Sequence, residues 1–345
     1  MRFRILGLFV AGGILGVSLN SGCSSTERAN INFSYVVQPE KSLPPGMKTI
    51  AIQAAKVGPT TDEKWSDISA TVLLSLVNES RSSFGTPVTV TDRRDTQVTF
   101  DEADLAGSGM STAKGGSPGQ LLAAQGAILS NINVKVEKHV GKQRTLSGFD
   151  LSGLMGEHTD AASVRAETAE VETVTRNMTV QTDFKLVDTS NNRVWDQDSS
   201  THNATERTEA SPFFGSSKTE AELTPQDRII GTLVERGARK FISRFMPVRI
   251  EVRAEVASSG NKSCAEGVRL LRAEQYDQAV SMFRNALNEN PNDHRAAFGA
   301  GVASEAAGQY SEALSFYQRS LAGQENEDYK EARDRVKTYG TRVRG

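Results

Sequence analysis

The sequence predicts a mixed α/β sandwich over residues 48–257, followed by an all-helical repeat domain over residues 262–340. In the first segment the apolar period changes repeatedly between two and about 3.6 residues, as expected when strands and helices alternate. The second segment has only the helical period, and its pattern recurs after 34 residues. Ser258 to Asn261 is a short polar hinge between them.

The first 22 residues have the pattern of a secretory signal. Arg2 and Arg4 precede an apolar run over residues 5–17, which is shorter than the roughly 20 residues that a membrane-spanning helix needs. Residues 23–47 are polar and contain three prolines, at 39, 44 and 45. We expect residues 1–22 to be a cleaved signal peptide and 23–47 to be a linker.

The segment Leu19–Ser25 resembles the bacterial lipobox, in which a cysteine is acylated and becomes the mature N-terminus. Gly22 and Cys23 fit this pattern, whereas Asn20 stands where it prefers an aliphatic residue. Ser24 resembles the residue that sorts such proteins to the outer membrane. The resemblance implies lipidation of Cys23 and a periplasm-facing anchor on the cell outer membrane. An ordinary cleaved signal is the alternative.

Composition argues against several kinds of site. Hydrophobic residues make up 37% of the chain and the net charge is -2, as in a globular protein with no sign of nucleic-acid binding. Lipidation of Cys23 would leave Cys264, the other of the two cysteines, as a free thiol. The four histidines are scattered and none has metal-ligand spacing. We expect no metal site and no cofactor.

Within 48–257 we expect strands near 50–52, 87–91, 132–136, 178–186 and 248–256, and helices near 65–76, 117–124 and 225–245. Thr224 is the expected N-cap of the last helix, with Pro225 in its first turn. Two stretches interrupt this pattern: 106–116 is rich in Gly and Ser, and 144–172 separates two strands that look paired by far more residues than a hairpin needs. We expect them to be long loops.

From residue 260 the pattern resembles the tetratricopeptide repeat (TPR) family. The register gives two repeats, 260–293 and 294–327, and a capping helix that follows them. Small residues are expected where helices cross, and aromatic residues between repeats, at Gly267, Tyr276, Ala279, Phe283, Gly301, Tyr310, Ala313 and Tyr317. Two repeats are fewer than the usual three, so we expect them to pack against the first domain or against a second copy of the chain.

The repeat resemblance implies a concave face that binds a peptide or helix of a protein partner. Polar residues of the inner helices that do not pack are candidates for this contact, with ordinary surface charge as the alternative. These partner-binding candidates are Arg269, Arg272, Arg295 and Glu305.

Five segments of the first domain, at 48–53, the helix around Trp65, 88–94, 120–138 and 180–199, resemble the domain shared by the curli secretion channel lipoprotein (CsgG) and the lipoprotein activators of penicillin-binding proteins (LpoB-like). Gly126 and Ala127 match its helix-to-strand junction. The resemblance implies an envelope lipoprotein that binds envelope proteins or peptides or forms a homo-oligomer.

Residues 115–119 have the G-x-S-x-G spacing of a nucleophile elbow around Ser117. Pro118 lacks the N–H that would complete the oxyanion hole, so we interpret the motif as a helix start. No catalytic residue is predicted. The leading hypothesis is a non-enzymatic lipoprotein that binds protein partners in envelope assembly. The alternative is a subunit of an oligomeric curli-type outer-membrane secretion channel, which the charged segment 144–172 disfavours.

Overall fold

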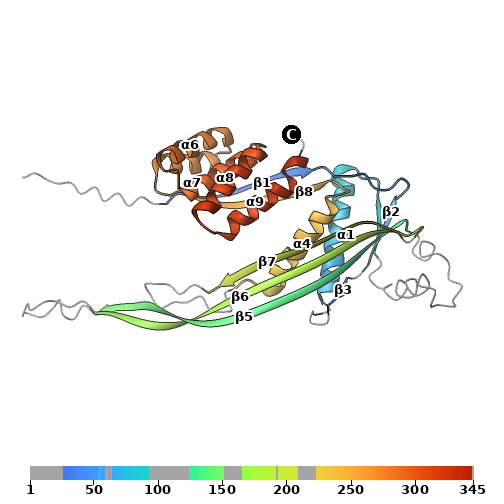
Figure 1. Cartoon of the computed structure of the whole chain (residues 1–345), viewed down its shortest axis with the longest axis horizontal. Coiled ribbons are helices and arrows are strands. Elements are labelled where there is room, and N and C mark those ends of the chain that lie inside the picture. The colour runs from blue at the N-terminus through green and yellow to red at the C-terminus, as the bar shows by residue number, and fades with distance from the viewer. Residues whose placement is uncertain are drawn as a thin grey trace, which may run out of the picture. The chain divides into compact units, whose positions relative to one another are not determined.

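The computed structural model describes residues 26–53, 55–58, 62, 64–92, 124–150, 165–191, 193–208 and 223–343 (Figure 1). The signal segment, Cys23, Ser117 and the expected loop at 106–116 lie outside these residues. The chain forms two compact units. We call Met1–Phe33 with Val252–Val336 the repeat unit, and Ser34–Glu251 with Lys337–Gly345 the sheet unit.

This division differs from the boundaries expected from sequence. Its boundaries fall within strands and a helix instead of in the segments between them. β1 (Arg28–Val37) pairs with β8 (Val248–Ala257) in a two-stranded sheet, and each strand contributes to both units. β1 lies within the segment expected to be linker. Its alternation of Ala29, Ile31 and Val37 with polar residues is the strand signal that the proline content of 23–47 obscured.

The sheet unit contains a six-stranded sheet of order β4-β2-β5-β6-β7, with β3 also pairing with β5. β2 is parallel to β4 and β5, and β5, β6 and β7 are antiparallel. The bounds are Thr49–Ile52 (β2), Lys56–Val57 (β3), Thr89–Asp92 (β4), Gly126–Asp150 (β5), Arg165–Asp188 (β6) and Arg193–Arg207 (β7). The strands predicted near 132–136 and 178–186 are confirmed as parts of β5 and β6.

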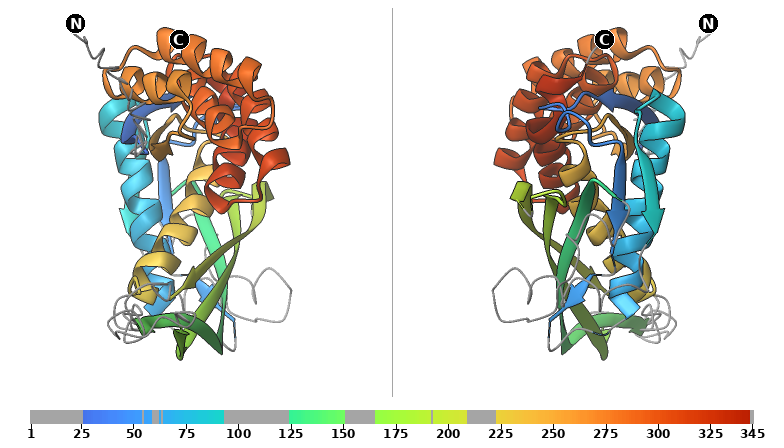
Figure 2. Two further views of the ribbon diagram at one scale, coloured as in Figure 1. Left: turned by 90° about the vertical axis from the view of Figure 1, so that its left-hand side faces the viewer. Right: turned by 90° about the vertical axis from the view of Figure 1, so that its right-hand side faces the viewer.

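Two helices, α1 (Lys64–Phe84) and α4 (Gln226–Ile242), lie side by side against one face of this sheet (Figure 2). Trp65 and Leu233 pack in one apolar cluster with Ile132, Met178 and Val180 of the strands. The intervening strand residues, such as Asn133 and Gln181, are exposed. One face is therefore covered by helices, while the other is polar.

Helix α4 begins one residue later than the sequence suggested. Pro225 is the N-cap, and no side chain makes a capping hydrogen bond there. The carbonyl of Thr224 instead accepts a hydrogen bond from the Arg176 guanidinium of β6. This hydrogen bond attaches the segment just before α4 to strand β6 of the sheet.

The segment 144–172 is not a loop over most of its length. β5 and β6 stay paired from Gly126 and Asp188 out to Asp150 and Arg165, with one shift between Leu146 and Gly148. Polar pairs in the strand register, such as Lys142 with Glu172 and Arg144 with Glu170, interrupt the apolar alternation that would have indicated this hairpin. Lys142 Nζ lies 3.7 Å from Glu170 Oε2. Only residues 151–164 remain outside the described strands.

Five helices form the C-terminal region, with bounds Lys262–Arg272 (α5), Tyr276–Glu289 (α6), His294–Ala306 (α7), Tyr310–Gly323 (α8) and Glu327–Tyr339 (α9). Asn261 caps α5 by accepting from the Cys264 N–H, and Asp293 caps α7 by accepting from the N–H groups of Arg295 and Ala296. The coarse fold class, a sheet region followed by helical repeats, is confirmed.

Aromatic rings and glycines pack between these helices. A Cβ on Gly267 of α5 would lie 2.8 Å from the Phe283 ring, and a Cβ on Gly301 of α7 would lie 2.5 Å from the ring of Tyr317. A Cβ on Gly299, which the sequence pattern did not single out, would also lie 2.5 Å from the Phe283 ring. Ala279 and Ala313 are fully buried, and Tyr276 and Tyr310 are partly buried against the same core.

Candidate functional site

The apolar core of the repeat unit is shared between its helices and the chain's own strands. Ala29 and Ile31 of β1 and Val256 of β8 belong to the same buried cluster as Val268 and Phe283. Arg272 of α5 also donates a hydrogen bond to a β1 carbonyl, that of Arg28. These strand residues supply additional packing surface for the two repeats.

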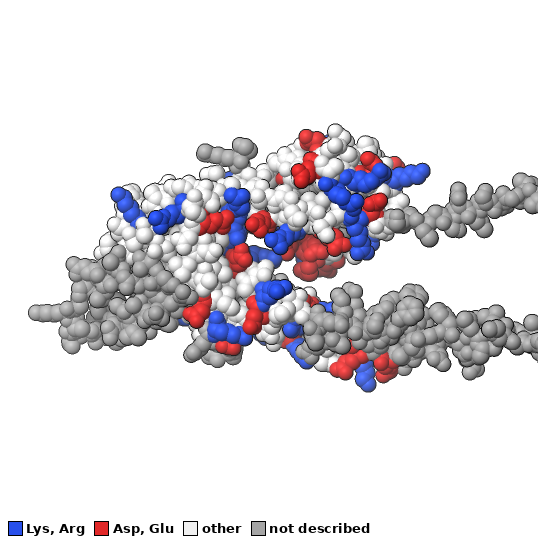
Figure 3. All heavy atoms as spheres, turned by 180° about the vertical axis from the view of Figure 1, so that it is seen from behind, with Lys and Arg blue, Asp and Glu red and all other residues white. Residues whose placement is uncertain are grey.

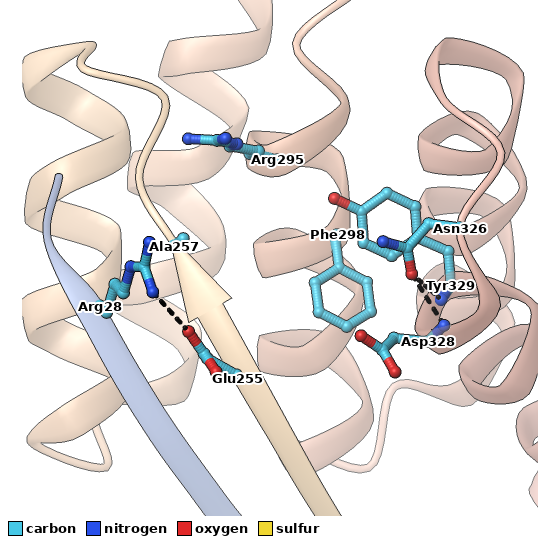
Figure 4. A pocket seen from close by; sticks show the side chains of 8 residues that line it. All are labelled: Arg28, Glu255, Ala257, Arg295, Phe298, Asn326, Asp328 and Tyr329. Carbon is cyan, nitrogen blue, oxygen red and sulfur yellow. Dashed lines mark hydrogen bonds and ion pairs between the residues drawn. The ribbon is translucent and has the colours of Figure 1, made fainter. Parts of the chain in front are cut away.

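A cavity of about 250 Å³ opens in the repeat unit between the strands and helices α7 and α9 (Figure 4). The strands contribute Arg28, Glu255 and Ala257 to its lining. Three further elements complete it: α7 through Arg295 and Phe298, the turn before α9 through Asn326, and α9 itself through Asp328 and Tyr329.

The two cations of the lining already have partners. Arg28 Nη1 lies 3.4 Å from Glu255 Oε1, and both side chains are more than half exposed at the cavity rim. Arg295 Nη1 donates to the carbonyl oxygen of Ser258 over 3.1 Å. Neither arginine therefore presents an entirely unpaired charge to the cavity.

Aromatic rings form the wall beside α9. Phe298 and Tyr329 stack with 4.4 Å between ring centroids, and His294 Nδ1 lies 3.0 Å from the hydroxyl oxygen of Tyr329. Burial raises the pKa of the Tyr329 phenol and lowers the pKa of the His294 imidazole. The phenol therefore stays protonated at neutral pH, and the imidazole stays neutral.

Asp328 lies at the first turn of α9, where Asn326 Oδ1 accepts hydrogen bonds from the N–H groups of Asp328 (2.7 Å) and Tyr329 (3.4 Å). Partial burial raises the pKa of the Asp328 carboxyl, and the nearby charges of Glu331, Glu255 and Glu327 raise it further. The carboxylate has no hydrogen bond or ion pair with any other residue that the structure describes. It is the uncompensated charge of the cavity.

The four partner-binding candidates from the sequence are not brought together. Arg295 lines the cavity, while Arg269 is exposed and pairs with Glu266 on its own helix. Arg272 is exposed and lies 3.8 Å from Glu27, besides its bond to β1.

Glu305 does not have the surface position expected for it, because it is 1% exposed. Its carboxylate accepts hydrogen bonds from the Arg335 guanidinium at 2.8 Å and from the Tyr317 hydroxyl at 2.7 Å. A buried carboxylate needs such partners, so Glu305 connects α7, α8 and α9 inside the repeats.

Four lining residues were not predicted from the sequence: Asp328, Tyr329, Phe298 and Glu255. The one available signal was local: Asn326 followed by acids is a helix-start pattern that puts Asp328 and Tyr329 in the first turn of α9. Glu255 belongs to a strand of a different segment, so no sequence spacing connects it to them.

On the face shown in Figure 3, the Lys and Arg side chains of the described residues occur together with Asp and Glu. This mixture agrees with the net charge of -2. Among the described helices, none is both long and apolar enough to span a bilayer.

Residues 264–335 match the family model described as "Tetratricopeptide repeat". The five helices and this match define the class of the C-terminal region: it is a TPR region, a kind of repeat that commonly provides a surface for protein partners. No curated protein matches the chain.

Two solved structures are similar over much of the chain. A putative neuraminyllactose-binding hemagglutinin homolog from Helicobacter pylori has 10% identity and a TM-score of 0.28, with 57% of this chain and 80% of that one covered. The PelC dodecamer from Paraburkholderia phytofirmans has 11% identity and a TM-score of 0.28, with 62% and 98% covered. Similarity at this TM-score carries no argument about function.

Proposed function

We propose that the chain is a non-enzymatic envelope lipoprotein that binds protein partners through its repeat unit. The observation that carries the proposal is the TPR match over 264–335. The cavity beside α7 and α9 supports it, because charged side chains lie at its rim and two aromatic rings line its wall. Such groups are common where proteins bind one another.

The absence of catalysis is part of the proposal. The phenol and imidazole at the cavity are held in their neutral forms, as the pKa shifts of Tyr329 and His294 indicate. With a raised pKa, the Tyr329 phenol is not an activated nucleophile at neutral pH. Ser117 is followed by Pro118, which cannot donate to an oxyanion.

The envelope location is supported by the sequence of the first 25 residues. An export signal followed by Cys23 would place the mature chain on the periplasmic side of the outer membrane, held by acyl chains. The resemblance of the sheet unit to CsgG-like and LpoB-like lipoproteins supports a second role of that unit in envelope assembly, either as a docking surface or in self-association.

The partner-binding part is tested by capture and crosslinking. The full-length chain, expressed in a bacterium, is crosslinked through lysines in isolated envelopes, and the crosslinked peptides are identified by mass spectrometry. We expect partner crosslinks at Lys262 and Lys330 of the repeat unit. Crosslinks confined to sheet-unit lysines such as Lys48 and Lys138, or no enriched partner, would contradict the proposal.

The anchor is tested separately with Cys23→Ala. The wild-type chain should incorporate radiolabelled palmitate and sediment with outer membranes. The variant should lose the label and appear in the periplasmic fraction. Equal labelling of both chains would exclude Cys23 as the acylated residue.

The second candidate function is a subunit of an oligomeric secretion channel. The β5–β6 hairpin favours it, since it continues past Thr175, where the pairing of β6 with β7 ends. Against it, the hairpin carries Lys138, Lys142 and Glu172 among its described exposed side chains. Detergent-extracted protein that sizes as a monomer or dimer and gives no conductance in planar bilayers would exclude this candidate.

A further inference from the structure

We propose that the cavity of the repeat unit is a receptor for one basic side chain, a lysine or an arginine, of the protein partner. This inference rests on the proposed function and specifies the chemistry of its recognition site. It is argued from the geometry, the charge and the size of the cavity.

The geometry suits an organic cation. Figure 4 shows the Asp328 carboxylate beside the ring of Phe298, whereas the carboxylate of Glu255 points toward Arg28. Phe298 and Tyr329 both line the cavity, and their rings stack with 4.4 Å between centroids. A guanidinium or ammonium group within about 6 Å of such a ring is attracted by its π face while a carboxylate binds its N–H groups.

The local charge is negative at this end of the cavity. Asp328 has no counter-ion among the described residues, and Glu255, Glu327 and Glu331 all act on it as like charges. Among the described residues, the ion-pair partner of Glu255 is Arg28 at the rim, at 3.4 Å. An entering cation would relieve the repulsion at Asp328 and share Glu255 with Arg28.

An anion is a poorer occupant of the same place. The two arginines of the lining are already engaged by Glu255 and by the Ser258 carbonyl. A bound carboxylate would also be repelled by Asp328 and would lie against the electron-rich faces of the rings.

The size of the cavity favours a single side chain. Its volume of about 250 Å³ is below the roughly 300–1,000 Å³ typical of sites for drug-sized ligands. A divalent metal ion would need about six oxygen ligands, and the described residues contain no group of three or more possible metal-binding side chains. A long, flexible basic side chain matches both the volume of the cavity and the Asp328 carboxylate.

The first test uses defined probes with the full-length ¹⁵N-labelled chain. Nα-acetyl-arginine methylamide and Nα-acetyl-lysine methylamide are titrated while backbone amide shifts are recorded by NMR. The neutral arginine isostere Nα-acetyl-citrulline methylamide is the probe control. We expect saturable shifts at Asp328 and Tyr329 with the two cations, and about ten-fold weaker binding of the citrulline probe.

Three variants assign the effect to the cavity. Asp328→Asn should weaken binding of the arginine probe about ten-fold, and Asp328→Glu should retain it because the charge remains. Asp334→Asn is the matched control: this exposed carboxylate is on the same helix and pairs with Arg333, outside the cavity lining. It should bind as the wild type does. Equal binding of the citrulline probe, or unchanged binding by Asp328→Asn, would overturn the proposal.

The second test connects the cavity to the partner. Capture from envelopes is repeated with Asp328→Asn and Asp334→Asn, and a selective loss of captured partner by Asp328→Asn supports the proposal. If Asp328→Asn loses the probe but captures the partner as before, the cavity takes a free cationic molecule; the assignment to a partner side chain then fails while the proposed function stands. If even the wild type enriches no partner, the proposed function fails, and this inference fails with it.

Discussion

Glu274 has a backbone φ of 58°, a left-handed conformation that is costly for a residue with a side chain. It lies in the turn between α5 and α6. Gly308 has φ 77° at the equivalent turn between α7 and α8, one repeat later. The second repeat therefore carries the residue that suits this turn, and the first does not.

We predict that Glu274→Gly raises the free energy of unfolding by about 0.5–1 kcal/mol, because it removes the strain at positive φ. Gly308→Ala should lower it by about 1 kcal/mol for the opposite reason. The control is Ala273→Gly, at φ -86°, where glycine should only destabilise. Urea unfolding measures all three, and a destabilised Glu274→Gly would refute the argument.

His202 of β7 is the described residue whose titration should be easiest to observe. Burial lowers the pKa of its imidazole to about 4, and the positive charges of Arg236 and Lys240 lower it further, against the opposing effect of Asp198. Its Nε2 atom is buried without a hydrogen-bond partner among the described residues. The folded state therefore resists protonation of His202.

We predict a loss of stability between about pH 6.5 and pH 4 that depends on His202. In this window the unfolded chain binds a proton at the imidazole and the folded chain does not, so the free energy of unfolding falls as the pH falls. After allowance for partial exposure, the loss is of the order of 2 kcal/mol. His202→Gln should remove this part of the pH dependence when the free energy of unfolding is measured by urea titration at pH 7 and 4.5. An equal fall in the free energy of unfolding for variant and wild type would contradict the prediction.

At the scale of elements, the contact of α4 with the sheet depends on a glycine. A Cβ on Gly237 would lie 3.1 Å from Ser200 Oγ and closer still to Thr182 Oγ1. Thr182 is fully buried, so it has no free space into which to move. The helix can approach the sheet this closely only without a side chain at this position.

We predict that Gly237→Ala destabilises the chain by about 1–3 kcal/mol, because α4 must move away from β6 and β7. Gly231 is the matched control on the same helix, because a Cβ added there would have nothing within 4 Å. Gly231→Ala should stabilise by about 0.5–1 kcal/mol through helix propensity alone. Thermal or urea unfolding distinguishes the two, and equal effects would exclude a packing role for Gly237.

Helices were easier to predict than strands in this chain, for a physical reason. The apolar stripe of α4 and the 34-residue register of the repeats are local patterns. The burial of Ile230, Phe283 and Tyr317 could therefore be predicted from their spacing in the sequence. The distal β5–β6 hairpin is held by backbone pairing between polar residues such as Lys142 and Glu172, which have no apolar period. The candidate cavity combines Glu255 of a strand with Asp328 of a distant helix, a proximity that only the fold creates.

At the scale of the molecule, the chain leaves the sheet unit and returns to it at its C-terminus. Residues from Lys337 onward belong with the sheet unit. Arg342 donates to the Ser243 carbonyl over 2.8 Å, its own carbonyl accepts from the Gln38 N–H over 2.9 Å, and Val343 forms a β-bridge with Val37. A deletion of 262–345 would thus remove contacts from the sheet unit together with the repeats.

We predict that Arg342→Ala lowers the stability of the sheet unit by about 1–3 kcal/mol, because it leaves buried acceptors such as the Ser243 carbonyl unsatisfied. The control is Arg319→Ala in the repeat unit, where an exposed guanidinium also donates to a carbonyl, that of Pro291. The fluorescence of Trp65 and Trp195, both in the sheet unit, reports its unfolding in urea. An unchanged urea midpoint for Arg342→Ala would show that the hydrogen bonds of Arg342 do not stabilise the sheet unit.

The pairing of β1 with β8 also has a consequence for the order in which the chain folds. Glu27 and Ser258 are hydrogen-bonded across a separation of 231 residues. The repeats close through local contacts, which form fast, whereas closure of so long a segment is slow. The first strand to be made is therefore among the last to be placed, and its alternating apolar residues stay exposed in the meantime.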